Sequence, residues 1–366
     1  MISVTGRILR MEMKLRKLWP LIGALCLSLV TPVFAQGNYG GSSSNSQSMH
    51  STSPKAGQGI YQRGTFREIT PNAGPRVAHG ADVFIRANFI WWKAVQEGTP
   101  TVYSGISGTK GKSLDYADEW DPGFKVGLGL NLSHDGWDIC SQYTWLHGSN
   151  TSSQSSSNLG FSQDSNASGQ SASGNFDYSF NSIDLELGRN FYLSQFLTMR
   201  PFIGFKGTWQ DQEHTTKLNT VVNNAVTSTF KARNDFDVWA LGFRGGLNLA
   251  YYMAKSWSIY GNVAFSNLWA NYTTIEAKGT TTPTGGDSTT NYHRDQDTHY
   301  AVKYVFESEI GLRWEMWFSD DNYHFAIQAG WAEQSWINWG VFDTNGALNF
   351  HDFNMHGLNL QFRFDF

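Results

Sequence analysis

Alternation of apolar and polar residues in ten segments constrains this chain of 366 residues more than any other feature. In 124–132, Phe, Val and Leu alternate with Lys, Gly and Asn. Residues 137–145 continue the pattern after a His-Asp-Gly turn. A period of two is typical of β-strands with one apolar face, and Asp-Gly is typical of a tight hairpin turn. The ten predicted strands are centred on 83–91, 124–132, 137–145, 183–187, 197–209, 239–249, 257–269, 302–316, 323–331 and 358–366.

The connections between these strands alternate in length. Four are short, at 134–136, 190–195, 253–255 and 319–322, whereas five are long and polar, at 97–121, 148–175, 211–233, 272–298 and 335–352. An outer-membrane barrel has short periplasmic turns, long outer loops and an even strand number. The chain is therefore predicted to be all-β, a transmembrane antiparallel β-barrel of about ten strands, and the Ser-rich segment 149–174 is predicted to be a surface loop.

Aromatic residues support the barrel over a soluble sandwich. The chain has 15 Trp, 15 Tyr and 25 Phe, but only 16% charged residues, against about 25% in soluble domains. No apolar run reaches the ~20 residues of a membrane-spanning helix. Trp residues gather at the ends of the apolar faces, which predicts two aromatic girdles at the lipid headgroups. The predicted girdle residues are Trp91, Trp137, Trp145, Trp209, Trp239, Trp257, Trp269, Trp314 and Trp331.

The N-terminal part reads as an export signal. Residues 1–35 have a basic start, a short apolar core and Val-Phe-Ala before Gln36, so we predict a signal peptide, followed by a flexible periplasmic extension at 36–80 and the barrel at 81–366. Residues 1–35 hold five basic and one acidic residue, so 27 basic and 31 acidic residues become 22 and 30. This acidic balance argues against nucleic acid as a partner. The predicted location is the outer membrane of a Gram-negative bacterium.

The apolar face of each strand must contact lipid, so the opposite phase lines the interior. Charged residues in that phase would be too costly in lipid and must face water or one another. The predicted lumen residues are Asp184, Glu186, Arg200, Lys206, Arg244, Glu307, Glu309, Arg313 and Glu315. An open lumen would conduct ions and small hydrophilic solutes, with weak cation preference because five acids oppose four bases. A plugging salt-bridge network is the alternative.

Two local motifs resemble a known family. The stretch 70–77 leads into 80–85 and Ile90-Trp91-Trp92, and 120–127 precedes His134-Asp135-Gly136-Trp137-Asp138. These stretches resemble the Legionella-type pore-forming outer membrane protein family, which includes the major-outer-membrane-protein-like porins of environmental chlamydiae. The resemblance implies a pore in the outer membrane. Unlike the cysteine-rich proteins of pathogenic chlamydiae, the mature chain keeps Cys140 alone, so we expect no structural cross-linking.

Other chemistry has little support in the sequence. No phosphate loop, zinc-ligand cluster or nucleophile elbow is present, so we predict no enzyme, no cofactor and no metal. Asp235, Asp237, Asp297 and His299 lie at loop margins and could form a rim protease similar to the omptins, which are also ten-stranded barrels.

The remaining expectations concern partners. The chain could be a plugged surface barrel that acts as an adhesin on a host surface or as a structural protein. Phe366 resembles the C-terminal signal that the outer-membrane insertion machinery reads, so that machinery and outer-membrane lipids are predicted partners. A homo-oligomer is a further possible assembly, and the sequence does not determine the oligomeric state.

Overall fold

The computed structural model describes residues 81–99, 102–104, 111–114, 119–133, 136–162, 164–319, 323–344 and 347–366. The predicted signal peptide and the predicted N-terminal extension lie outside the described residues. No helix in this described part is long and apolar enough to cross a membrane.

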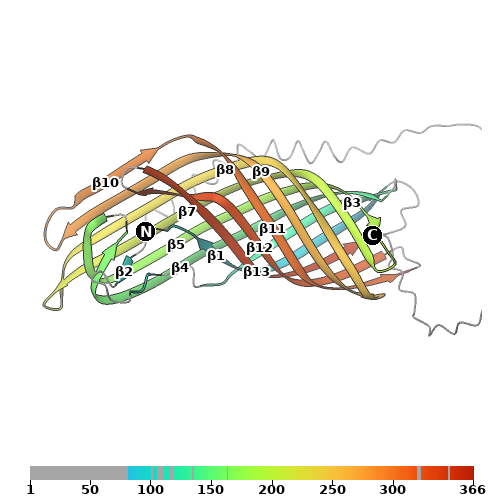
Figure 1. Ribbon diagram of the computed structural model, residues 1–366, viewed down its shortest axis with the longest axis horizontal. Helices are drawn as coiled ribbons and strands as arrows, with labels where there is room; N and C mark the ends of the chain where they lie inside the picture. Colours follow the sequence, from blue (N-terminus) through green and yellow to red (C-terminus); the bar gives the residue numbers. More distant parts are fainter. Residues whose placement is uncertain are drawn as a thin grey trace, which may run out of the picture. The chain divides into compact units, whose positions relative to one another are not determined.

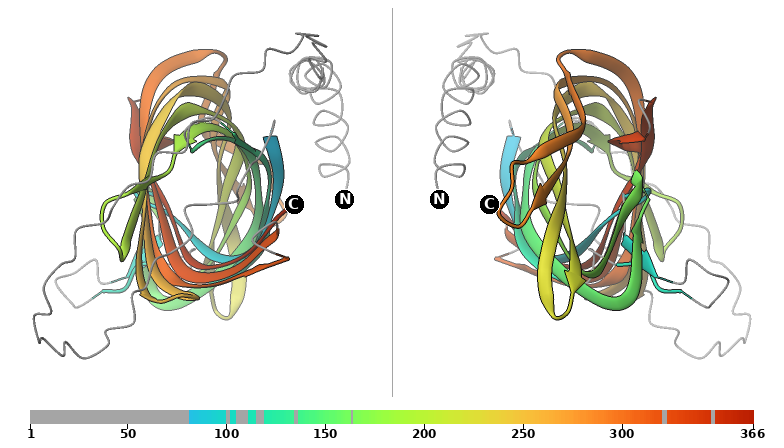
Figure 2. Two further views of the ribbon diagram at one scale, coloured as in Figure 1. Left: turned by 90° about the vertical axis from the view of Figure 1, so that its right-hand side faces the viewer. Right: turned by 90° about the vertical axis from the view of Figure 1, so that its left-hand side faces the viewer.

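Ten long strands form one closed ring (Figures 1 and 2). Each strand pairs antiparallel with its neighbours, and the ring closes where the last strand pairs with the first, from Phe84 opposite Asp365 to Gln96 opposite Phe353. This confirms the predicted barrel. The ring consists of β1 (Ala81–Gln96), β3 (Asp121–Leu132), β4 (Trp137–Phe161), β5 (Asp164–Arg189), β7 (Leu197–Val222), β8 (Ala225–Ala254), β9 (Trp257–Pro283), β11 (His299–Phe318), β12 (Tyr323–Thr344) and β13 (Ala347–Asp365). Three short strands are β2 (Val102–Ser104), β6 (Phe191–Tyr192) and β10 (Thr289–Gln296).

Much of the predicted loop sequence is paired strand. β4 and β5 stay paired from Trp137 opposite Arg189 to Phe161 opposite Asp164, so the Ser-rich segment forms a hairpin and not the irregular surface loop that we predicted. β7 and β8 likewise stay paired until Val222 opposite Ala225. These strands extend past the aromatic band as long hairpins at one end of the barrel (Figure 1). Their polarity reflects contact with water, and in a strand whose backbone is fully paired it does not require a loop.

The outer face of the barrel is apolar between two levels of Trp side chains. None of the nine predicted girdle residues is buried; Trp269 is 50% exposed and Trp331 is 49% exposed. Trp239 packs against Trp269 with ring centroids 5.4 Å apart, and Trp257 lies opposite Trp314 at the short-turn end. Trp120 adds to the Trp level nearer the long hairpins, where its ring contacts those of Trp91 and Trp331. The sequence analysis did not select it.

The final residue completes the short-turn end. Phe366 donates its backbone N–H to the carbonyl of Val83 at 2.9 Å, so the chain end is attached to the first strand. Its side chain is 49% exposed and packs on Phe364. Its role as an insertion signal stays a prediction.

Aromatic side chains fill the interior at the long-hairpin end. β12 bulges between Trp336 and Gly340, and Asn338 there has a positive φ of 54°. The bulge points Trp336 and Trp339 inward, where both are fully buried. Trp336 reaches Phe180 on β5, five strands away in either direction around the ring, with centroids 5.4 Å apart. The Tyr272 hydroxyl donates to the Trp339 carbonyl at 2.6 Å. We call Phe180, Tyr272, Trp336 and Trp339 the aromatic cap.

His214 lies in the long-hairpin interior beyond the aromatic band. Its ring stacks on Phe176 with centroids 4.2 Å apart, and it contacts Phe342 from across the barrel. Burial among these apolar rings disfavours the charged imidazolium and lowers the pKa of His214 from 6.5 to about 3.

We predict that acid loosens this end of the barrel. A His with a lowered folded pKa binds a proton more readily when unfolded, so stability is full above pH 6.5 and falls as pH falls toward 3. The loss is about 2 kcal/mol at pH 5. Hydrogen exchange of 172–178 and 212–216 should rise between pH 7 and pH 5 in the native protein, and His214→Phe should remove this dependence. Equal pH dependence in both proteins would contradict the assignment.

Candidate functional site: the charged interior

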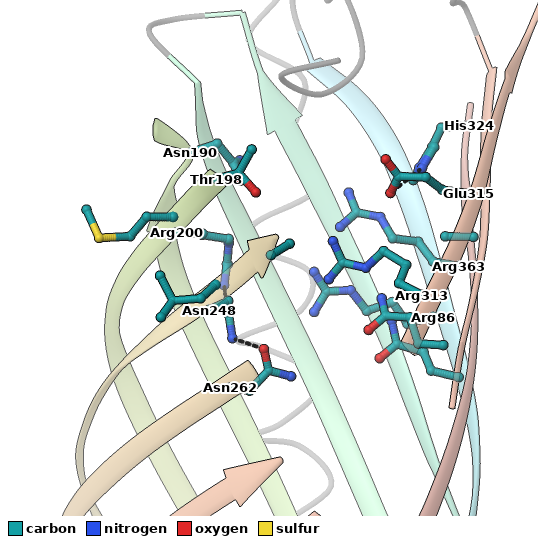
Figure 3. Close-up of a pocket in the computed structure, with 16 residues that line it drawn as sticks. Arg86, Asn190, Thr198, Arg200, Asn248, Asn262, Arg313, Glu315, His324 and Arg363 are labelled. Atoms are coloured by element: carbon teal, nitrogen blue, oxygen red, sulfur yellow. Dashed lines mark hydrogen bonds and ion pairs between the residues drawn. The ribbon is translucent and has the colours of Figure 1, made fainter. Parts of the chain in front are cut away.

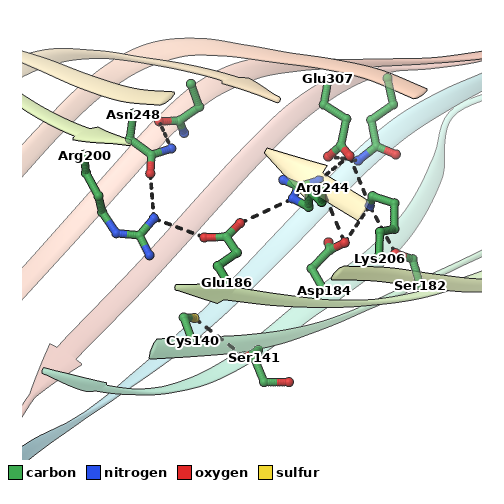
Figure 4. Close-up of polar contacts among 12 residues, drawn as sticks. Cys140, Ser141, Ser182, Asp184, Glu186, Arg200, Lys206, Arg244, Asn248 and Glu307 are labelled. Carbon is green, nitrogen blue, oxygen red and sulfur yellow. Dashed lines mark hydrogen bonds and ion pairs between the residues drawn. The ribbon is translucent and has the colours of Figure 1, made fainter. Parts of the chain in front are cut away.

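A layer of ion pairs, which we call the charge layer, crosses the interior on the short-turn side of the aromatic cap (Figure 4). Lys206 on β7 is 1% exposed, and its Nζ lies 2.8 Å from Asp184 Oδ1 and 3.1 Å from Glu307 Oε1. Asp184 comes from β5 and Glu307 from β11, so one ammonium joins three strands. Alternation produces this arrangement, because the position before each of these residues holds an apolar side chain on the outer face: Ile183, Phe205 and Phe306.

Arginines extend the same layer. Arg244 on β8 pairs with Glu307 and lies 3.5 Å from Glu186. Arg200 on β7 donates to Glu186 at 3.1 Å and to both carboxylate oxygens of Asp138, at 2.5 and 2.8 Å. Six of the nine predicted lumen residues therefore belong to one connected network, in which each buried charge has an opposite charge beside it. Charges taken out of water need such pairing.

The other three predicted lumen residues lie along β11 outside this network. Glu309 accepts hydrogen bonds from the Tyr260 hydroxyl at 2.6 Å and from Asn359 at 2.9 Å. Arg313 lies 5.5 Å from the Tyr260 ring centroid. Glu315 Oε2 lies 3.6 Å from His324 Nε2.

The predicted lumen residues leave out several other interior ions. Asp138 pairs with Arg200, and Asp365 pairs with Arg363 at 2.6 Å. The interior ions outside the predicted set include Asp138, Asp365, Arg86, Lys125, Lys303 and Arg363. A usable signal was present: Arg363 and Asp365 alternate with Phe362, Phe364 and Phe366, and Arg86 alternates with Ile85 and Ala87.

The interior also holds Cys140 on β4. The thiol belongs to a free cysteine and is buried, at 2% exposure. Its Sγ lies 3.8 Å from the Ser141 carbonyl oxygen.

The rim residues of the protease hypothesis lie on opposite faces of the sheet. Asp235 and Asp237 on β8 alternate with Phe236, which contacts Tyr272 inside the barrel at 6.0 Å. His299 packs on that inner side, against Phe350 at 5.4 Å. Asp235 instead pairs with Arg233 at 3.0 Å on the other face. Asp235 and Asp237 therefore do not face His299 as the rim hypothesis requires, and Asp297 lies in the connection before β11. In the described part of the chain, no group of three His, Cys, Asp or Glu is arranged to hold a metal.

Comparison with known proteins decides the family of this charged barrel. The model of the Legionella pneumophila major outer membrane protein precursor matches residues 75–366. The chain belongs to this family. The match confirms the resemblance seen in the sequence and makes the chain an outer-membrane β-barrel protein of the major-outer-membrane-protein family. No curated protein matches the chain.

Solved structures with a similar chain path include other outer-membrane barrels. The outer membrane protease OmpT from Escherichia coli is 10% identical, with 78% of this chain and 97% of that chain covered and a TM-score of 0.41. OprG from Pseudomonas aeruginosa is also 10% identical, with 79% and 98% covered and a TM-score of 0.25. Ail, the attachment invasion locus protein of Yersinia pestis, is 8% identical, with 78% and 99% covered and a TM-score of 0.21. These low TM-scores say nothing about what this barrel binds or does.

We predict that Lys206 is the cation on which the charge layer depends. Lys206→Met removes the ammonium that pairs with both Asp184 and Glu307, and losing one partner of a buried ion pair costs about 3–5 kcal/mol. Urea unfolding of the refolded protein in liposomes should show this loss. Lys206→Met with Asp184→Asn should recover part of it, and Lys231→Met, at an exposed position on the same long hairpin, should change little. Equal stabilities of Lys206→Met and the native protein would refute the assignment.

Proposed function

We propose that the protein is a passive outer-membrane pore for ions and small polar solutes. The observation that carries this proposal is the charge layer, which crosses the barrel interior and adjoins a hollow polar chamber. That chamber, of about 120 Å³, lies at the short-turn end and is lined by Arg200 and Asn248 among others (Figure 3). The start of β1, the C-terminal Phe366 and the short turns lie at this end, which is the periplasmic end in bacterial barrels. Membership in the major outer membrane protein family supports the same function.

The aromatic cap lies in the interior on the long-hairpin side of the charge layer. Trp336, Trp339, Phe180 and Tyr272 are each at most 1% exposed, so these four rings fill part of the interior at this level. Lys206 lies 5.7 Å from the Trp336 ring centroid and connects the cap to the charge layer.

Charge selectivity is expected to be weak. The predicted cation preference rested on an excess of one acid among nine residues, and it stays a prediction. Among the additional interior ions, Asp138 and Asp365 are acids, whereas Arg86, Lys125, Lys303 and Arg363 are bases, so the excess of acids disappears when they are counted. We infer that the reversal potential in a salt gradient is small, because ions meet both signs of charge in one layer.

A filled interior favours one alternative. Since the cap spans the barrel, the protein could be a plugged surface barrel whose long hairpins contact a host surface. The rim-protease alternative loses its geometric support, because its Asp and His side chains lie on opposite faces.

Conductance in planar bilayers tests the pore and the cap together. We predict discrete steps for the refolded mature protein and larger steps for Trp336→Ala with Trp339→Ala, because two large rings are removed from the closure. Trp331→Ala, on the outer face of the same strand, is the matched control and should conduct like the native protein. Silence of both the native protein and the cap variant, with each shown to be folded by heat-modifiable migration, would favour the plugged barrel.

A second prediction concerns the acidic side of the layer. Changing Glu307, Glu309 and Glu315 to Gln removes three interior negative charges, so the permeability of chloride relative to potassium should rise. Reversal potentials in a potassium chloride gradient measure this change. Glu333→Gln, at an exposed position on β12, should leave the reversal potential unchanged. An unchanged reversal potential in a folded triple variant would show that these carboxylates do not face the conducting path.

A further inference from the structure

The chamber at the short-turn end is unusually rich in arginine. Its lining contains Arg86, Arg200, Arg313 and Arg363, whereas Glu315 is the one carboxylate among the lining residues that the structure describes. Figure 3 shows the guanidinium groups of Arg86, Arg313 and Arg363 close together on one wall, with Arg200, Asn248 and Asn262 on the other. We call this space the arginine chamber.

Two of these arginines are neutralised by the protein and two are not. Arg200 pairs with Asp138 and Glu186, and Arg363 pairs with Asp365. For Arg86 and Arg313, no carboxylate of the described chain lies within 4.0 Å of a guanidinium nitrogen, and the buried Nε of each has no hydrogen-bond partner there. A buried guanidinium with an unused donor is costly, which makes these two groups candidates for binding a ligand.

The strand register places these charges together at a cost. Arg86 on β1 lies directly opposite Arg363 on β13, and like charges at directly opposed positions destabilise a sheet. Both guanidinium carbons lie over the ring of Phe84, at 4.9 and 4.1 Å from its centroid. Phe84 is fully buried. An aromatic face attracts a cation but carries no net charge, so it orients the two groups without neutralising them.

The opposite wall adds neutral polar groups. Asn248 accepts from Arg200 at 2.8 Å and donates to the Asn262 carbonyl oxygen at 3.0 Å. Because Asn262 uses its oxygen in that contact, its amide NH₂ remains a donor at the chamber wall. Arginine donors on one side and an amide donor on the other suit an acceptor-only ligand.

We propose that the arginine chamber binds a phosphate group, carried by a free phosphate ion or by a small phosphorylated solute. Guanidinium groups bind phosphate oxygens through paired, charge-assisted hydrogen bonds, and two negative charges would offset Arg86 and Arg313. A volume of about 120 Å³ holds the equivalent of about four waters, which accommodates one phosphate group. The site does not require an open pore, because the chamber lies on the short-turn side of the charge layer.

Calorimetry on the refolded mature protein in nonionic detergent tests the site without a membrane. At low ionic strength and pH 7.5, inorganic phosphate should bind saturably at one site per chain, and glycerol 3-phosphate reports whether an esterified phosphate is also accepted. Arg86→Gln with Arg313→Gln should weaken binding at least tenfold. Arg233→Gln, whose guanidinium pairs with Glu213 on the outer face, is the matched control and should bind like the native protein.

Several outcomes would overturn the proposal. Absence of saturable binding to the folded native protein would do so, as would undiminished binding to the folded double variant. If the double variant fails to fold, Arg313→Gln alone should still weaken binding, and Arg86→Lys should retain more affinity than Arg86→Gln because it keeps the charge. Binding without conductance would support this site and argue against the pore, so the two proposals fail separately.

Discussion

The pairing of β13 with β1 is the constraint on which the rest of the structure depends. In lipid, each unpaired backbone group costs several kcal/mol, so an open sheet edge is excluded and the ring must close. Closure fixes which face of every strand meets lipid, and the period-two alternation then assigns each side chain. Lys206 and Arg244 occupy the interior for this reason, since neither could be tolerated in the hydrocarbon region.

Placing charges inside a narrow barrel creates a second requirement, because each must find a partner. The charge layer meets it by joining residues from β4, β5, β7, β8 and β11, and Lys206 alone joins three strands through Asp184 and Glu307. Such links add side-chain contacts across the barrel to the backbone pairing of neighbouring strands. They also leave little room for deviation, since removing one partner exposes the other to the full desolvation penalty.

The sequence was sufficient to predict the barrel, its strand number and the phase of each strand, because these follow from alternation and turn positions. It did not predict the hairpins of β4 and β5, since Ser and Asn in water-exposed paired strands have the composition of a loop. It also could not predict the aromatic cap. Trp336 and Trp339 are three apart and break the alternation, and the contact of Trp336 with Phe180 joins strands on opposite sides of the ring. Contacts across a barrel depend on shear and bulges, which no local pattern encodes.

The two ends of the interior are built from different chemistry, and the charge layer separates them. On its long-hairpin side, Trp336 and His214 are buried against other aromatic rings. On its short-turn side, Arg86 and Arg313 face a hollow chamber, and the Nε–H donor of each has no hydrogen-bond partner in the described chain. The layer itself carries paired charges of both signs. Lys206 lies against Trp336 on one side of the layer, and Arg200 lines the chamber on the other. A barrel needed only as a scaffold gains nothing from Arg86 and Arg313 without carboxylate partners, and the like-charge position of Arg86 opposite Arg363 lowers its stability. The cost is explained if something anionic occupies the chamber, and this argument holds whether or not the cap opens.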